Sequence, residues 1–256
     1  MKKIILSGFS VLFAGFTALA LAAPAGQIQN AAGDVKLITK TAAPKSATAG
    51  SAVDQGTMIQ TGKNSHAVIR FADGQLVALD SNSTFRLDEY QFDLATPETS
   101  TFVGSFLRGA ARFVTGLIGD RNRSGWRVDT PLMTAGIRGS DWLTALRNNN
   151  LYVGVQSGGV NITNSAGTLG VDAGQGAILG SATTPGQLVS FSLLPANVFG
   201  NLPSLSLSAF GGSAAGAGGA TIGGVSLPAV TGIVIGVGAA AGLAASGGGS
   251  STATHH

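Results

Sequence analysis

Five arginines within twenty residues are the group of side chains in this sequence best suited to binding something. An arginine cluster with few acids nearby can hold an anionic polymer or an acidic partner surface, and only Asp120 interrupts this one. The alternative is a set of solvated strand faces, because alternation along a strand sends successive side chains to opposite sides. We expect the solvated faces and keep a partner-binding patch as the alternative. The five are Arg108, Arg112, Arg121, Arg123 and Arg127.

No other group of residues points to catalysis or to a metal. The carboxylates show no spacing that singles out a general acid–base pair. Zinc sites need grouped Cys and His ligands, and this chain has no cysteine, a lone His66, and a pair at the end of the sequence, His255 and His256. Residues 56–64 (GTMIQTGKN) have five residues between their glycines, where a phosphate-binding loop has four. We therefore expect no catalytic residues, no cofactor and no metal.

Residues 128–142, VDTPLMTAGIRGSDW, combine a proline with two glycines three positions apart. Pro131 restricts Thr130 to an extended conformation, which suits a strand with the proline at its edge or entry. Gly136 and Gly139 permit a tight turn or a close backbone approach that a Cβ would forbid. The segment is interpreted as a structural corner.

Arg138 lies between those two glycines in mostly uncharged surroundings. An arginine that is buried or half-buried is usually paired, and Asp141 and Asp129 are the nearest carboxylates in the sequence. We interpret Arg138 as a staple that holds the corner, with a ligand contact as the alternative.

Composition and turn signals predict an all-β fold. The chain has 39 glycines and 11% charged residues, which suits short strands joined by tight turns better than long helices. Asp73 and Gly74 separate two alternating apolar runs, a strong hairpin signal, and residues 148–150 (NNN) mark another turn. Short strands at even spacing predict a short-stranded β-roll, a solenoid-like fold or a sandwich. Large aromatics should fill its core: Phe102, Phe106, Phe113, Trp126 and Trp142.

Residues 1–22 have the layout of a secretory signal peptide: two lysines, an apolar run, and small residues before the cleavage site. We expect cleavage after Ala22 and export of the rest, with a retained N-terminal anchor as the alternative. Without Lys2 and Lys3, 13 of the 15 basic residues remain against 12 acidic ones. The exported chain is thus close to neutral, and we expect no nucleic-acid partner.

Composition changes after Asp172, beyond which residues 173–256 contain no Lys, Arg, Asp or Glu. We expect a β domain over 26–182 and a low-complexity linker over 183–227. An apolar Gly/Ala segment, 228–245, precedes a flexible polar tail, 246–256. Within that segment, 229–245 is just long enough for a membrane span and carries small-xxx-small spacing. Membrane insertion or self-association into a homo-oligomer is favoured there over a flexible tail.

Four blocks of the sequence, in order, resemble the FecR-like domain family. Residues 128–142 are similar to its V-x-T-P-x-A-x-x-G-I-R-G-T-x-F signature, with Met, Ser and Trp at positions that are usually Ala, Thr and Phe. Residues 56–87, 106–116 and 151–179 resemble its other blocks. The resemblance spans about 120 residues and does not extend to 183–256.

The resemblance implies a role in the envelope of a Gram-negative bacterium. Signalling members of the family carry this domain in the periplasm and relay a receptor's state through one membrane helix. A chain that starts with a signal peptide lacks their cytoplasmic segment, so we expect a stand-alone exported member in the periplasm or at the cell surface. It would be a non-catalytic binding, scaffolding or signalling-accessory module for an envelope protein or glycan. The alternative is a surface or matrix structural protein that self-assembles through its Gly/Ala-rich tail.

Overall fold

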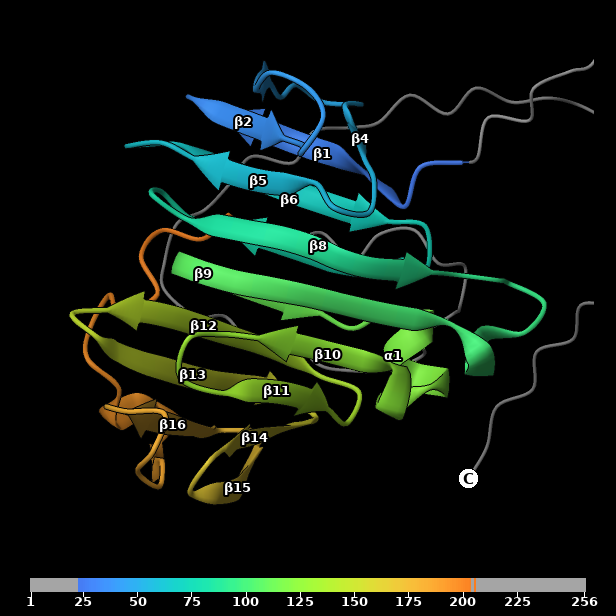
Figure 1. Ribbon diagram of the computed structural model, residues 1–256. Coiled ribbons are helices and arrows are strands. Elements are labelled where there is room, and N and C mark those ends of the chain that lie inside the picture. Colours follow the sequence, from blue (N-terminus) through green and yellow to red (C-terminus); the bar gives the residue numbers. More distant parts are fainter. Residues whose placement is uncertain (1–22, 204, 206–256) are drawn as a thin grey trace, which may run out of the picture. The chain divides into compact units, whose positions relative to one another are not determined.

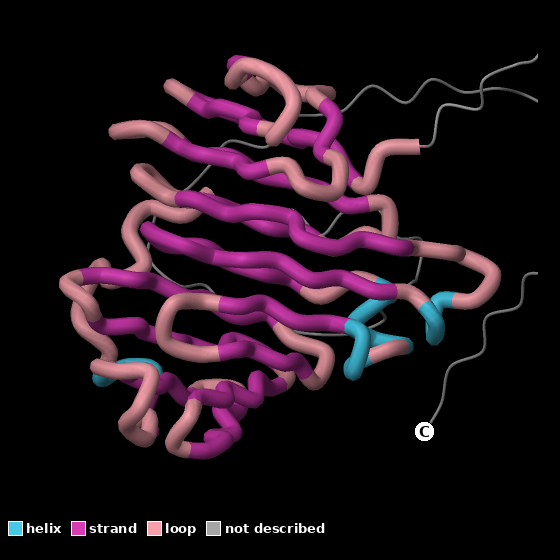
Figure 2. The backbone as a smooth tube through the Cα atoms, in the orientation of Figure 1, coloured by secondary structure: helices cyan, strands magenta, loops and turns pink. Residues whose placement is uncertain are grey.

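The structure is a computed structural model that describes residues 23–203 and residue 205. In this part of the chain, 17 strands form one connected sheet system, stacked from β1 and β2 to β15 and β16 (Figure 1). The one α-helix, α1 (Leu117–Arg121), is five residues long, and three short 3-10 turns, Pro97–Thr99, Arg123–Gly125 and Phe191–Leu193, complete the helical structure described (Figure 2). The predicted all-β fold is confirmed.

The strands form two layers that pack on one core, which among the predicted alternatives is closest to a sandwich. Layer A contains, in spatial order, β4 (Ala52–Val53), β1 (Gly26–Ala32), β6 (His66–Phe71), β7 (Leu76–Leu79), the second half of β9 (Thr101–Val114), β12 (Asp141–Arg147), β13 (Asn150–Ser157), β16 (Gln175–Leu179) and β17 (Gln187–Ser190). Layer B contains β3 (Lys45–Ser46), β2 (Val35–Ile38), β5 (Met58–Thr61), β8 (Thr84–Gln91), the first half of β9, β10 (Trp126–Asp129), β11 (Thr134–Ile137), β14 (Gly159–Asn164) and β15 (Gly167–Asp172).

Strand β9 joins the two layers. Residues 101–108 pair with β8 in layer B, whereas residues 109–114 pair with β12 in layer A. The change occurs at Gly109, whose φ of 94° is a left-handed conformation that favours glycine. The next residue is fixed by Ser83, because the Ala110 N–H donates to Ser83 Oγ at 3.0 Å. The longest described strand therefore acts as the hinge line of the fold.

Both layers turn one face onto a shared aromatic core. Phe102 stacks on Trp126 within layer B with ring centroids 5.5 Å apart, and Phe113 stacks on Trp142 within layer A at 4.8 Å. Trp126 meets Trp142 edge-on across the layers at 6.4 Å, a favourable arrangement for aromatic rings. The prediction of core aromatics is confirmed: Phe102, Phe106, Phe113, Trp126 and Trp142 are all buried.

The two turns predicted from the sequence are present, and their residues have the positive φ angles expected of glycine and asparagine. Gly74, at the β6–β7 turn, has a φ of 87°, and Asn148 and Asn149, between β12 and β13, have φ values of 50° and 62°. Glycine and asparagine are the residues that best tolerate these angles. Strand β1 was not predicted, since its sequence, GQIQNAA, has little apolar alternation.

The sheet continues beyond residue 182, where the sequence suggested that the β domain ends. Strand β17 pairs with β16 through Gln175↔Ser190 and the three pairs that follow. An edge strand is held by backbone hydrogen bonds and does not depend on charged side chains. The loss of charged residues therefore does not mark the end of the fold. The boundary expected at 182/183 falls inside the folded unit, and part of the expected linker is a strand.

Within residues 23–203 and 205, no helix is long and apolar enough to cross a membrane. The signal peptide, 1–22, the apolar Gly/Ala segment, 228–245, and the tail, 246–256, lie outside the described residues. These expectations therefore remain predictions.

Candidate functional site

The Gly-rich motif forms a corner at which the chain crosses from layer B to layer A. Strand β11 ends at Ile137 in layer B, and β12 begins at Asp141 in layer A. Gly139, between them, has a left-handed φ of 69°. The return crossing, from β13 to β14, passes directly over it: a Cβ on Gly158 would lie 1.9 Å from the Gly139 carbonyl oxygen. Two glycines thus allow two crossings to touch.

The rest of the motif differs from the sequence interpretation. Gly136 lies in β11 with open space where a Cβ would be, so neither a turn nor a close approach requires glycine there. Thr130 and Pro131 form the turn between β10 and β11 and are not a strand entry. The Met133 N–H donates to Thr130 Oγ1 at 3.0 Å, and the Thr130 N–H donates to the Met133 carbonyl oxygen at 2.8 Å. The threonine therefore closes this turn.

Arg138 extends across the outer face of layer B. Its Nη2 donates to Asp172 Oδ1 at the end of β15. The guanidinium passes over Gly159, where a Cβ would lie 2.5 Å from Nη2. The prediction that Asp141 or Asp129 is its partner is wrong, because sequence neighbours on the two sides of a corner enter different strands.

The two expected carboxylates bind other arginines. Arg112 donates from Nε and Nη2 to the two carboxylate oxygens of Asp141, at 2.8 and 2.6 Å, in a bidentate pair. The side chains of that pair are 20% and 15% exposed, and the hydrogen bonds to Asp141 raise the pKa of Arg112. Arg127 pairs with Asp129 at 3.0 Å in a more exposed position. Arg112, predicted as a partner-binding residue, is thus an internal partner of Asp141.

The structure disperses the five arginines of the predicted patch. Arg108 and Arg127 lie on the outer face of layer B, and Arg127 is in register with Val103, five residues before Arg108 in β9, so the two positions are about 17 Å apart at 3.4 Å per residue. Arg112 lies on the outer face of layer A, because β9 changes layers before it. Arg121 ends α1, and Arg123 begins the following 3-10 turn, both exposed. No single surface of the described chain gathers all five.

The outer face of layer B instead carries a continuous row of polar side chains, which we call the polar ladder. One residue comes from each of six neighbouring strands, β8, β9, β10, β11, β14 and β15, in direct register: Arg86, Ser105, Asp129, Thr134, Thr163 and Thr168. Thr134 Oγ1 donates to Asp129 Oδ1 at 2.8 Å, and the hydroxyls of Thr163 and Thr168 lie 2.9 Å apart. The row presents ordered donors and acceptors on a sheet surface. Sequence reasoning missed it, because its members are adjacent only through strand register.

Asp73 has a second role beyond its turn. Its carboxylate is fully buried and accepts hydrogen bonds from the backbone N–H of Gln75 at 3.2 Å and of Ile118 at 3.3 Å, and from the Tyr90 hydroxyl at 3.3 Å. Burial raises the pKa of Asp73, and burial together with the nearby carboxylate raises the pKa of Tyr90. Asp73 ties the β6–β7 turn to β8 and to α1. Its partners 17 and 45 residues away gave no sequence signal.

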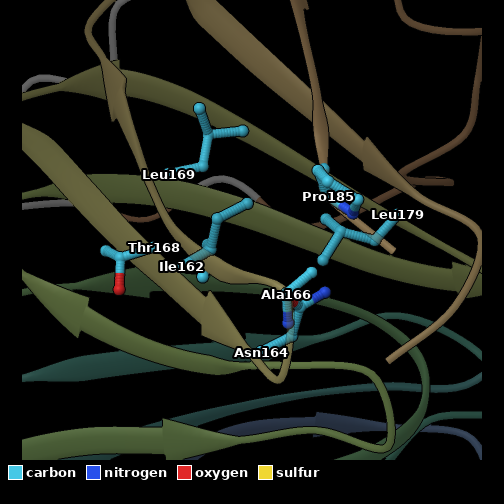
Figure 3. Close-up of a pocket in the computed structure, with 9 residues that line it drawn as sticks. Ile162, Asn164, Ala166, Thr168, Leu169, Leu179 and Pro185 are labelled. Carbon is cyan, nitrogen blue, oxygen red and sulfur yellow. The ribbon is translucent and has the colours of Figure 1, made fainter. Parts of the chain in front are cut away.

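A small pocket lies beside β14, β15 and β16 (Figure 3). Its volume is about 130 Å³, below the range of sites that enclose drug-sized ligands. Ile162, Leu169, Leu179 and Pro185 give it an apolar lining. The nearby Asn164 amide already donates to the Thr184 carbonyl oxygen at 2.8 Å. No group of three metal-binding side chains occurs in the described chain.

We expect Arg138→Ala to lower the free energy of unfolding by no more than about 1 kcal/mol, because its pair with Asp172 is 41% and 66% exposed. Arg112→Ala should cost about 2 kcal/mol or more, since it leaves the half-buried Asp141 carboxylate without its bidentate partner. Urea denaturation of both variants measures the difference. Equal losses would mean that Arg138 holds the corner as firmly as Arg112 holds β9 to β12.

The family match concerns the part of the chain that contains this corner. A family model, FecR protein, matches residues 57–161. Two crystal structures, at 2.50 and 1.65 Å resolution, of a candidate anti-sigma factor from Parabacteroides distasonis ATCC 8503 are similar to this chain. Each has 15% sequence identity and a TM-score of 0.42, and the similarity covers 52% of this chain and 59% of the other.

No curated protein matches this chain. The FecR match runs from β5 into β14 and includes both the crossing of β9 and the corner after β11. The resemblance noted in the sequence is confirmed by the match of the FecR family model to residues 57–161.

Proposed function

We propose that this chain is an exported, non-catalytic module of the cell envelope that binds a protein or glycan partner through the polar ladder. The observation that carries the proposal is the ladder itself. It crosses layer B from β8 to β15, and its first four residues, those from β8 to β11, lie within the range that the FecR model matches, whereas Thr163 and Thr168 lie just beyond it. The match to the FecR family supports a signalling-accessory role for such binding.

The chemistry of the ladder favours a polar partner. Hydroxyls and carboxylates at neighbouring strand positions are spaced by about 4.8 Å, which suits repeated hydrogen bonds to a glycan or to a polar protein surface. Arg86 in the ladder and Arg127 and Arg138 beside it are each paired with a carboxylate. Arg108, on the same face, donates to the Asn82 carbonyl oxygen. The face is therefore close to neutral, and it provides no attraction for a polyanion such as nucleic acid.

Site-specific photocrosslinking in the native envelope tests the proposal. A photoreactive residue at Thr163 or Thr168 is expected to give one discrete adduct, because both side chains are exposed on the ladder. Thr183, an exposed threonine in the loop before β17, is the matched control. Loss of the adduct on glycosidase treatment identifies a glycan, and loss on protease treatment identifies a protein. Equal adducts from Thr183, or none from the ladder, would contradict the proposal.

Self-assembly is the second candidate, and the open ends of the layers favour it. Among the described strands, β15 pairs only with β14, and β17 only with β16. Unpaired strand edges can add a strand from another copy. This alternative predicts crosslinked species at multiples of the chain's own mass. It also predicts that the full chain is recovered from the medium as large assemblies. The envelope module predicts recovery in the periplasmic or envelope fraction, with the chain starting after Ala22.

A further inference from the structure

The outer edge of β15 ends layer B, and part of its backbone points away from the sheet. The Arg138 N–H donates to the Gly159 carbonyl oxygen at 2.8 Å, so Gly159 and every second residue after it in β14 face β11. The residues between them face β15, where their partners are Gly167, Leu169 and Val171. The backbone groups of Thr168 and Gly170 therefore point to the outer side of β15.

These groups make no hydrogen bond within residues 23–203 and 205. Strand β15 pairs with β14 alone, and no other group bonds the main chain of Thr168 or Gly170. The next N–H on this side, that of Asp172, confirms the direction, because it donates to Gln175 Oε1 at 2.9 Å and not to β14. Thr168 and Gly170 are both exposed. Two N–H and two C=O groups, about 6.8 Å apart along the edge, are thus accessible to a partner.

The pocket of Figure 3 lies on the inner side of the same edge. Leu169, which lies between Thr168 and Gly170 and is half-buried, lines it. The rest of its apolar lining comes from β14, β16 and the loop before β17: Ile162, Leu179 and Pro185. Its volume of about 130 Å³ is close to the roughly 150 Å³ at which an apolar cavity holds a molecule of the size of benzene. The pocket therefore suits one apolar side chain.

We propose that the edge of β15 binds an extended segment of another polypeptide, which adds a strand to layer B and places one apolar side chain in this pocket. A strand is the ligand whose N–H and C=O groups repeat at the spacing of those on Thr168 and Gly170. The partner residues opposite these two point to the outer face of layer B. The residue between them, opposite Leu169, points inward to the pocket. A polar–apolar–polar sequence in the partner satisfies both the edge and the pocket.

The outer face beside this edge favours polar residues at the two outward positions of the partner. The polar ladder ends at Thr168, whose hydroxyl lies 2.9 Å from that of Thr163, so outward polar side chains continue this row. Gly170 has no side chain to obstruct its neighbour on the added strand. The site is separate from the ladder surface and does not require that the ladder binds anything.

A second copy of this chain fits the site less well than a free segment does. The inward residues of its own β15 are Leu169 and Val171, and both are already packed in their own molecule. Val171 is fully buried, and Leu169 lines that molecule's pocket. A contact between two β15 strands therefore has no free apolar side chain to place in the pocket.

A library of random nine-residue peptides, selected on the immobilised full exported chain, tests the proposal. We expect the enriched peptides to alternate polar and apolar residues, with one large aliphatic residue at the centre. In a labelled synthetic copy, aspartate at that central position should weaken binding at least about tenfold, because a carboxylate is costly to bury in an apolar pocket. Fluorescence anisotropy measures the Kd.

Gly170→Pro removes one accessible N–H from the edge. An edge strand tolerates proline where the N–H faces solvent, so β15 keeps its pairing with β14, which urea denaturation verifies. The variant should bind the selected peptide at least about tenfold more weakly. Gly170→Ala is the matched control, because it retains the N–H and its Cβ would lie no closer than 3.6 Å to any neighbour. Thr134→Ala alters the ladder and not the edge, so it should bind the peptide normally, and failures of the two sites are distinguishable.

Methylation of the peptide amides tests strand addition without changing the protein. Alternate amides of a strand face its neighbour, so methylating one alternate set should abolish binding and methylating the other should not. The proposal is overturned if no peptide is enriched, if Gly170→Pro binds as tightly as Gly170→Ala, or if both methylated sets bind equally. A dimer of the chain that Gly170→Pro abolishes, with no peptide enriched, would make a second copy the occupant.

Discussion

Asp73→Ala is expected to lower the free energy of unfolding by about 3–5 kcal/mol, a large part of the 5–15 kcal/mol typical of a folded domain. The alanine leaves three donors without an acceptor: the backbone N–H groups of Gln75 and Ile118 and the Tyr90 hydroxyl. Each unsatisfied buried donor costs about 1–3 kcal/mol. The fully buried site gives water little access to replace the carboxylate. Urea denaturation followed by tryptophan fluorescence measures the loss.

Asp93→Ala is the matched control for that loss. Asp93 closes a turn of the same kind, since its Oδ1 accepts from the N–H two residues on, that of Ala95, at 2.8 Å. It is exposed, so water replaces the lost acceptor and we expect a loss of less than about 1 kcal/mol. If both variants lose the same free energy, the turn geometry matters and the buried network does not.

The Asp73 carboxyl makes the stability of the fold depend on pH. Its pKa is raised in the folded state above the ordinary value of 3.8 by burial. Below 3.8 the carboxyl is protonated in both states. As pH rises, the unfolded chain loses this proton first, so the folded state binds more protons and stability falls until pH passes the folded pKa.

Asp73→Asn removes this titration and retains one acceptor oxygen. The difference in unfolding free energy between the natural chain and this variant should therefore shift against the natural chain as pH rises above 3.8. A difference that stays constant between pH 3 and 7 would show that the hydrogen bonds to the carboxylate fully offset its burial.

Local sequence signals predicted the parts of this fold that local chemistry determines. The Asp73-Gly74 turn, the asparagine turn before β13 and the buried aromatics follow from φ preferences and apolar character. The FecR signature was readable because its residues are contiguous. Each of these features involves residues close together in sequence.

Features that depend on strand register were missed. The sequence around Arg138 suggested Asp141 or Asp129 as its partner. In the fold, β15 instead brings Asp172 next to Arg138. The polar ladder and the facing pair of Gly154 and Gly176 likewise exist only after distant strands pair. Residues 191–203 were assigned to a linker because they contain no charged residue, although Phe191 and Phe199 lie over Gly154 of the sheet and such an apolar contact needs no charge.

Gly109→Ala is expected to destabilise the domain by about 3 kcal/mol or more, through two separate effects. A Cβ would lie 2.5 Å from Ser83 Cα and 2.7 Å from Ser83 Cβ, a contact that requires the backbone to move. The φ of 94° adds about 1 kcal/mol of strain for any residue with a Cβ. Because β9 passes from layer B to layer A at this residue, such a shift disturbs pairing in both layers.

Two other glycines separate these effects. Gly50 has a φ of 84° with open space around its Cβ position, so Gly50→Ala carries the conformational strain alone, about 1 kcal/mol. Gly136 has neither a positive φ nor a neighbour within 4 Å, so Gly136→Ala should be neutral or slightly stabilising, even though the position belongs to the family signature. Thermal unfolding of the three variants should rank Gly109→Ala far below Gly50→Ala, with Gly136→Ala at the level of the natural chain. A Gly109→Ala chain as stable as Gly50→Ala would mean that β9 crosses between the layers without the close contact to Ser83, and that the hinge line of the fold lies elsewhere.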